Sequence, residues 1–297
     1  MAVQQADSVP AAGARPLAAP WASRAGRHRL SGGLRIYLPA AVLLVLLFFC
    51  FVWPEVYPVP PPVGGSILSA NLPIGSRGHL LGTDTVGNDI LSRILYGGLV
   101  SFEVGVATQV IGLVAGGLLG VITACAAGVT DFVLMRALDA LIAFPALILV
   151  LTVVDELGPS ELHVIFALSF FTVPAFARLG RASTLRLLDL PFVTAARLSG
   201  SPWWRIIARH LIPNVLPSLL TYSFLGAGIA IILEGALSYL GYGIPPPQPS
   251  WGDMIADGQS VVTTQPGLVL IPTVFLFITV VTLNALGDGL RARWASR

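Results

Sequence analysis

Few side chains in this sequence are spaced for covalent or metal chemistry. The four histidines stand at positions 28, 79, 163 and 210, too far apart along the chain to suggest a local metal cluster. Cys50 and Cys125 both lie within apolar runs, and their spacing indicates neither a disulfide nor half of a zinc site. The chain holds no HExxH zinc motif and no GxSxG nucleophile elbow. We therefore expect no catalytic residue, no metal site and no cofactor on this chain.

The basic residues exclude further classes of chemistry. All 17 of them are arginine, and the sequence has no lysine. A P-loop that grips nucleotide phosphates and a Schiff base on lysine are both excluded. No basic patch is interleaved with exposed aromatics, so nucleic acid is not an expected partner.

Carboxylates near apolar stretches are the remaining chemical candidates, because an acidic group in lipid is costly and suggests function by default. Glu103, Glu234 and Asp288 lie within about two helical turns of a predicted span end, and we expect them to be interfacial anchors. Asp139 follows Arg136 by three residues, on the same helical face, and predicts an ion pair. An ion relay at Asp139 is the alternative.

Composition indicates the elements that must position these groups. Of the 297 residues, 55% are hydrophobic and 11% are charged, against about 25% charged in a typical soluble domain. Six segments are long enough to cross a bilayer. They are 36–54, 98–126, 133–154, 162–179, 214–240 and 267–287. The sequence thus predicts an all-α, polytopic membrane protein with six transmembrane helices in a single membrane domain over residues 37–291.

Arginine placement predicts the orientation. With both termini in the cytoplasm, 15 of the 17 arginines fall on the cytoplasmic side, and only Arg77 and Arg93 fall outside. The outside loops are then 55–97 and 241–266, and the loop over 180–213 is cytoplasmic. Residues 1–36 are expected to form a mobile cytoplasmic tail before an uncleaved first helix, with a signal peptide as the alternative. Residues 292–297 are expected to form a cytoplasmic C-terminal tail.

Glycines punctuate the second predicted span. Gly112, Gly116 and Gly120 recur every four residues, which places them on one helical face. Such a face lets two membrane helices approach closely. We expect packing within the bundle, with a pore or a partner-subunit interface as the alternative.

The cytoplasmic loop TAARLSGSPWWRIIARHLIP, residues 194–213, is basic and amphipathic between two apolar spans. Gly200 is placed to end a short helix that begins at Pro191. Ser201 and Pro202 are placed as the N-cap and the first residue of a second short helix. An amphipathic segment lying on the membrane surface would have the same composition, so physics alone leaves docking and surface binding open.

The same loop resembles the EAA motif of ABC-importer permeases, which reads Glu-Ala-Ala, three residues, Gly, nine residues, Ile-x-Leu-Pro. Ala195, Ala196, Gly200 and Pro213 match at the family spacing, while Thr194 stands in place of the glutamate. The resemblance implies that Thr194–Gly200, with Arg197 and Ser201, forms a coupling helix that docks on an ATPase subunit.

Further segments are similar to the dipeptide/oligopeptide/nickel branch of that family, most of all its "C" type subunit. They are His79–Asp84 with Gly87, Asp89 and Leu91–Arg93; Met135–Arg136 with Asp139 and Phe144–Pro145; Glu234–Gly241 with Pro246–Pro247, Pro249–Gly252 and Ala256–Gly258; and Pro266–Gly267 with Asn284 and Gly287–Arg291. The likeness spans about residues 75–291.

The resemblance implies a permease of the bacterial inner membrane that forms half of a translocation pathway for di- or oligopeptides. Its implied partners are a second, "B" type permease, an extracytoplasmic binding protein, and two ATP-binding subunits that carry ATP and Mg. Nickel, glutathione or haem are alternative substrates, and a stand-alone secondary transporter is a less favoured alternative class. On the outside, Gly82, Thr83, Asp84, Asp89 and Trp251 would face the binding protein. Turn formation by the two aspartates and an aromatic-belt position for Trp251 are the simpler interpretations.

Overall fold

The computed structural model describes residues 33–295, and helices are the regular elements in that range, apart from two isolated bridge pairings before α3. In chain order the helices are α1 (Leu34–Leu47), α2 (Trp53–Val56), α3 (Ile90–Ile111), α4 (Gly117–Ala126), α5 (Gly128–Ile142), α6 (Ala146–Leu157), α7 (Glu161–Leu188), α8 (Pro191–Leu198), α9 (Trp203–Ile206), α10 (Ile212–Tyr239), α11 (Trp251–Gly258) and α12 (Gly267–Ala295). The predicted all-α fold is confirmed.

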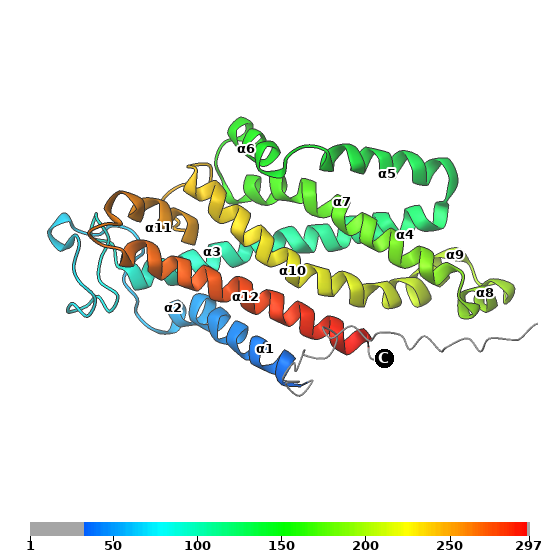
Figure 1. The fold of residues 1–297 in the computed structure, drawn as a ribbon, viewed down its shortest axis with the longest axis horizontal. Coiled ribbons are helices and arrows are strands. Elements are labelled where there is room, and N and C mark those ends of the chain that lie inside the picture. The colour runs from blue at the N-terminus through cyan, green and yellow to red at the C-terminus, as the bar shows by residue number, and fades with distance from the viewer. Residues whose placement is uncertain (1–32, 296–297) are drawn as a thin grey trace, which may run out of the picture.

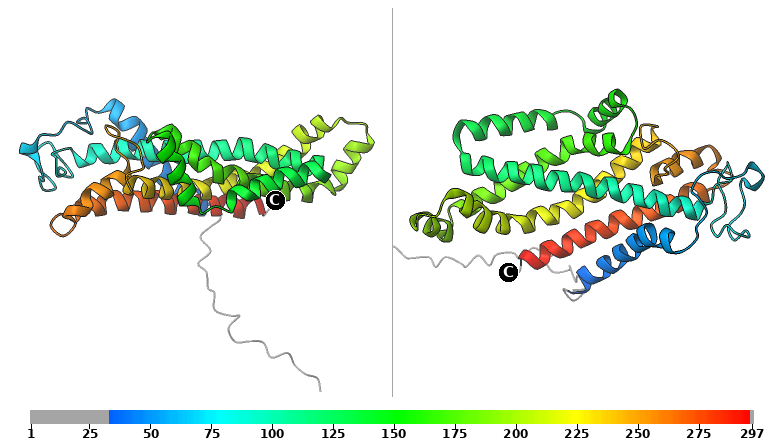
Figure 2. Two further views of the ribbon diagram at one scale, coloured as in Figure 1. Left: turned by 90° about the horizontal axis from the view of Figure 1, so that it is seen from above. Right: turned by 180° about the vertical axis from the view of Figure 1, so that it is seen from behind.

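The long helices lie side by side along the longest axis of the molecule (Figure 1; Figure 2). Residues 57–89 and α11 gather at one end, which we call the α11 end. The short helices α8 and α9 project at the opposite end, which we call the α8 end. The first residues of α1 and the last residues of α12 are turned toward the α8 end.

Among the described residues, five helical stretches are long and apolar enough to cross a membrane, and there are six if the bent pair α5–α6 counts as one span. The five are Leu34–Val56, Ile90–Ala126, Glu161–Leu188, Trp203–Tyr239 and Gly267–Trp294. All five extend beyond the predicted apolar windows at one or both ends. A helix continues into water wherever capping and propensity allow, so apolarity marks only its membrane portion.

The expected single helix over 133–154 is wrong. The segment is two helices, α5 and α6, bent by 85° at their junction. Pro145 stands at the break, and a residue before proline is disfavoured in the α conformation. Phe144 is that residue, so the chain turns there.

The loop and tail boundaries also move. The loop expected over 55–97 ends at Asp89, because α3 begins at Ile90, and the loop expected over 180–213 contracts to 189–202. Residues 292–295 belong to α12 rather than to a tail. The remainder of the two expected tails, residues 1–32 and 296–297, lies outside the described residues.

Within residues 33–295, three π-helical turns interrupt the long helices, and two of them have a clear cause. The turns at Phe48–Val52 and Ile207–Leu211 lie just before Pro54 and Pro213. Proline lacks an N–H, so the carbonyl four residues earlier loses its α-helical donor and the local winding changes. Both helices nevertheless continue, which gives the uninterrupted stretch Trp203–Tyr239.

The third π turn, Gly112–Gly116, belongs to the glycine face expected in the second span. A Cβ on Gly116 or Gly120 would meet the carbonyl oxygen of Val173 or Ala177 in α7, and one on Gly112 would lie 2.6 Å from the Phe176 ring. The glycines therefore allow close approach of α7 within this chain. Because α7 fills that face, the alternative of a pore or partner interface there is wrong.

Candidate functional site

Helix α8 is a short, separately ended helix at the α8 end of the bundle. Gly200 has a φ of +73°, and its N–H donates to the Arg197 carbonyl at 3.0 Å. The Ser201 N–H donates to the Ala196 carbonyl at 3.2 Å. These two bonds form a Schellman motif, which requires a left-handed residue at Gly200. The predicted end of the helix at Gly200 is confirmed.

One side of α8 is fixed to the bundle and the other is exposed. Val193 is fully buried in a cluster with Phe176, Ile206 and Leu211. Thr194, Ala195 and Arg197 are exposed, and Ala196 is partly buried. Leu198 is 85% exposed, a large fraction for an apolar side chain. The helix thus presents a small, mostly uncharged face away from the bundle.

The segment after Gly200 differs from the prediction. Ser201 makes no N-cap: the cap position is Pro202, and the helix begins at Trp203. The proline side chain has no oxygen to accept a hydrogen bond from the backbone N–H groups of the first turn. Helix α9 therefore starts without a side-chain cap. The expected second short helix is also wrong as a separate unit, because Trp203–Tyr239 is one helical stretch that passes Pro213 without ending.

The two tryptophans at this turn pair with arginines. The Arg197 guanidinium lies 4.4 Å from the centre of the Trp203 ring, and that of Arg205 lies 5.2 Å from Trp204. Both are cation–π distances. The first contact crosses the turn, and it links α8 directly to the long helix.

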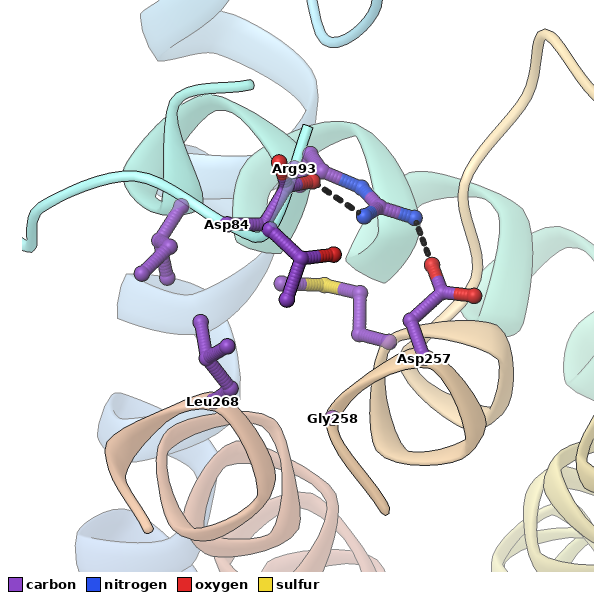
Figure 3. Close-up of a pocket in the computed structure, with 8 residues that line it drawn as sticks. Asp84, Arg93, Asp257, Gly258 and Leu268 are labelled. Carbon is purple, nitrogen blue, oxygen red and sulfur yellow. Dashed lines mark hydrogen bonds and ion pairs between the residues drawn. The ribbon is translucent and has the colours of Figure 1, made fainter. Parts of the chain in front are cut away.

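At the α11 end, Asp84 is held by a buried polar network (Figure 3). Its carboxylate accepts hydrogen bonds from the backbone N–H groups of Val86 and Asn88 at 2.9 and 2.8 Å, and one from the Asn88 side chain at 2.9 Å. Arg93 Nη1 donates to Asp84 at 2.7 Å, and Nη2 donates to Asp257 at 2.8 Å. The remaining space between these groups is about 10 Å³. The network is filled and leaves no room for a ligand.

The other loop residues are also used within the loop. Asp89 caps α3 by accepting from the Ser92 N–H at 2.7 Å, and its second oxygen lies 2.8 Å from His79 Nδ1. The Thr83 hydroxyl donates to the Ser69 carbonyl at 2.5 Å. Gly82 has a φ of +82° and lies against the backbone at Leu72. Turn formation and capping are thus the observed roles of Asp84 and Asp89.

Trp251 is fully buried, so an aromatic-belt position is wrong. Its indole Nε1 donates to the Ile94 carbonyl in α3 at 3.0 Å, and its ring packs against Phe102 and Phe275. The residue joins α11 to α3 and α12. Asp84, Thr83, Asp89 and Trp251 therefore shape the α11 end from within and offer little surface to a partner.

Residues 116–297 match a family model described as the binding-protein-dependent transport system inner membrane component. The match covers more than half of the chain. The chain belongs to this family. It is a permease component of an ABC importer of the bacterial inner membrane, and it is a non-catalytic subunit of that system.

Individual relatives agree with the family. The glutathione transport system permease protein GsiD of Pectobacterium atrosepticum is 36% identical over 253 residues, which are 85% of this chain and 84% of the relative. The di/tripeptide transport system permease protein DppC of Pseudomonas aeruginosa is 32% identical over 281 residues, 93% and 90% of the two chains. An inward facing structure of the MetNI methionine ABC transporter has a TM-score of 0.56 at 17% identity, covering 67% of this chain and 95% of that one. That likeness shows the shared permease fold.

Glu234 differs from its predicted role, and Asp139 has a partner in addition to the predicted one. Glu234 was expected as an interfacial anchor but is fully buried, and it accepts hydrogen bonds from Ser101 at 3.0 Å and Ser238 at 2.8 Å. Asp139 forms the expected ion pair with Arg136, whose Nη1 is 4.0 Å away. Its closer partner is Arg178 of α7, at 2.6 Å. Glu103 and Asp288 are exposed, as interfacial residues would be.

Sequence reasoning did not identify the residues that tie the permease together at the α11 end. Arg93 and Asp257 stood in motif segments, but no local spacing could pair two residues 164 positions apart. Asp253 was also missed. Burial raises the pKa of Asp253 to about 7, with contributions from the neighbouring carboxyl groups of Glu234 and Asp257, while Arg93 acts in the opposite direction.

Proposed function

We propose that this permease imports short peptides and forms half of the translocation pathway beside a second, homologous permease. The support is in the relatives: one is named for glutathione, which is itself a tripeptide, and another for di- and tripeptides. Peptides of two or three residues, delivered by an extracytoplasmic binding protein, are the substrate class common to both names.

In this proposal the α8 end faces the cytoplasm and meets two ATP-binding subunits, which carry the ATP and Mg. The positive-inside distribution of arginines supports this orientation. ATP chemistry belongs on other chains, because this sequence has no lysine for a P-loop. The α11 end then faces the binding protein.

The observation that carries the proposal is the mechanical continuity from α8 into the bundle. Helix α8 is fixed by buried Val193 and by the stacking of Arg197 on Trp203. Trp203 is the first residue of the 37-residue helical stretch that ends at Tyr239. A force on the exposed face of α8 would therefore reach a membrane-spanning helix with only one turn, 199–202, in between. Such rigid-body transfer is how a bound nucleotide can bias a two-state switch.

Thr194 changes the expected docking contact without removing it. The family glutamate would offer a carboxylate, whereas this face offers a hydroxyl with Ala195 and Leu198 beside it. We infer that the ATPase groove contacts α8 through shape and apolar area here, and less through charge.

The test is uptake of labelled dipeptides, tripeptides and glutathione, together with ATPase activity, by the complete transporter reconstituted in liposomes. Gly200→Glu should abolish peptide-stimulated ATP hydrolysis and uptake while the subunit still inserts. Normal ATP-driven uptake by that variant would show that α8 is not the coupling helix. Uptake by this polypeptide alone would overturn the importer-subunit reading, and uptake of only nickel or haem would overturn the peptide assignment.

Gly241→Glu is the matched control. Gly241 also has a left-handed φ, +84°, and an added Cβ there would likewise meet nothing within 4 Å. It lies at the opposite end of α10. Backbone strain and added charge are therefore the same in both variants, and only Gly200→Glu should uncouple ATP hydrolysis from transport.

A further inference from the structure

Side chains of α7, α10 and α12 line a groove at the α8 end of the bundle. Helix α10 lies between α7 and α12 there (Figure 1). The groove has a volume of about 790 Å³. The polar and amphipathic side chains that line it include Arg186, Asn214, Ser218, Tyr222, Arg291 and Trp294. Guanidinium, amide and hydroxyl groups together form a donor-rich lining, which suits an anion.

The two arginines of the groove have no carboxylate partner within residues 33–295. Arg186 donates only to its own helix, to the Ala182 carbonyl and the Ser183 hydroxyl, both at 3.3 Å. Arg291 forms no ion pair in that range, and neither do Asp189 and Asp288, the acidic residues nearest in sequence on the same side. The positive charge of the groove is therefore available to a ligand.

Chemistry along this face of α10 changes with depth. Asn214, Ser218 and Tyr222 lie at the groove, and Ile229 and Ile232 continue the same helical face toward the middle of the span. The two isoleucines are 59% and 46% exposed. From Tyr222 to Ile232 the helix rises roughly 15 Å, about half of a 30 Å hydrocarbon core. A polar site therefore passes into an apolar strip about one leaflet long.

We propose that this groove binds an anionic phospholipid from the leaflet at the α8 end. The headgroup phosphate lies between Arg186 and Arg291, and an acyl chain runs along Ile229 and Ile232. Trp294 also lines the groove, and tryptophan is a residue type enriched where membranes meet water. This inference does not depend on which solute the permease carries.

The apolar strip favours a lipid over other anions. A peptide carboxylate would be satisfied by the two arginines, but a polar solute gains nothing from Ile229 and Ile232. A second permease could cover the isoleucines, but two unpaired arginines at the same interface would then need acidic partners. A phospholipid fits both parts of this face, because its phosphate suits the two arginines and its acyl chain suits the two isoleucines.

The experiment measures lipid binding to the purified full chain in nanodiscs and by native mass spectrometry. Dioleoyl phosphatidylglycerol is compared with dioleoyl phosphatidylcholine, and Arg186→Gln/Arg291→Gln with wild type. We expect retained phosphatidylglycerol on the wild-type protein, and an affinity lowered by about fivefold per arginine, or about 25-fold in the double variant. A short-chain glycerophosphate should bind more weakly than the full lipid.

Arg205→Gln/Arg209→Gln provides the matched control, because it removes the same charge from exposed positions outside the groove. An equal loss in that variant would reduce the effect to net charge and overturn the site. Equal binding of the two wild-type lipids would also overturn it. Displacement of phosphatidylglycerol by a dipeptide, but not by its C-amide, would assign the groove to the substrate carboxylate instead. If Arg186→Gln/Arg291→Gln does not fold, the comparison of the two lipids and the dipeptide competition, both on the wild-type protein, still test whether the groove binds an anionic lipid.

Discussion

Arg93 in α3 and Asp257 in α11 meet across 164 residues of sequence, with Nη2 donating to Oδ2 at 2.8 Å. The other amino nitrogen of the same guanidinium donates to Asp84 at 2.7 Å. One side chain thus connects a loop, a membrane helix and a surface helix. The two carboxylates are not equivalent, because Asp84 is 7% exposed and Asp257 is 55% exposed at the side chain.

Arg93→Gln should destabilise the protein by about 3 kcal/mol, since it leaves the buried Asp84 carboxylate without its cation. This loss of unfolding free energy is at the low end of what breaking a buried ion pair costs, because the Asp84 carboxylate keeps three N–H donors. Thermal unfolding in detergent would show it as a lowered Tm. Arg77→Gln changes an exposed arginine in the loop that precedes α3, and should change stability by less than about 0.5 kcal/mol. Similar Tm values for both variants would contradict the role assigned to the Arg93–Asp84 pair.

Asp253 gives a pH dependence that can be isolated. Its pKa in the folded protein is about 7, raised from 3.8 mainly by burial. Between these values the folded state holds a proton that the unfolded state has lost, so this group lowers stability as pH rises from about 4 to about 7. Below that window the group has no effect on stability, and above it the loss is constant. Tm measured from pH 4 to 8 should fall less steeply in Asp253→Asn, whose amide stays neutral.

Asp155→Asn is the control for that profile, because Asp155 is an exposed carboxylate in another helix, α6. It should leave the slope of Tm against pH unchanged. An Asp253→Asn profile parallel to wild type between pH 4 and 7 would rule out Asp253 as a source of the dependence.

The sequence predicted membrane segments well because apolarity over about 20 residues has few alternative causes. It failed where a helix leaves the apolar region. Asp89, a capping residue followed by Ile90 and Leu91, marked the start of α3, yet the hydropathy window placed it eight residues later. The 85° bend at Phe144–Pro145 was signalled by the proline, but prolines in membrane helices are often tolerated, as Pro174 is in α7.

Contacts between residues far apart in the chain could not be predicted from the sequence for a different reason. Glu234 was placed near a span end, where water would make a carboxylate inexpensive, but α11 folds over that end and buries it. The serines that accommodate it, Ser101 and Ser238, lie 133 and 4 residues away. Only the second lies at a spacing that a helical pattern could indicate. The local motif at Gly200 was predictable because its bonds span five residues or fewer.

Helix packing at Gly116 should be far less tolerant than at its neighbour Gly117. A Cβ at Gly116 would meet the Val173 carbonyl oxygen, which belongs to the backbone of α7 and cannot move alone. A Cβ at Gly117 would meet Leu219 Cδ1 at 2.9 Å, the end of a flexible side chain. Gly116→Ala should therefore cost about 1–3 kcal/mol or more, and Gly117→Ala about 1 kcal/mol or less. Tm values of the two variants check this, and a reversed order would mean that α7 is not in contact there.

Gly200 and Gly241 end α8 and α10 with the same Schellman geometry at opposite ends of the bundle. Gly241 donates to the Ser238 carbonyl and Tyr242 to that of Leu237, at 3.0 and 2.9 Å. Because an added Cβ at Gly200 meets nothing, Gly200→Ala loses only the left-handed conformation, about 1 kcal/mol, and Asn should lose less. Amide hydrogen exchange in α8 should quicken about fivefold in Gly200→Ala, less in Gly200→Asn, and not at all in Gly241→Ala. Unchanged exchange in Gly200→Ala would show that α8 is ended by its contacts with the bundle rather than by this glycine.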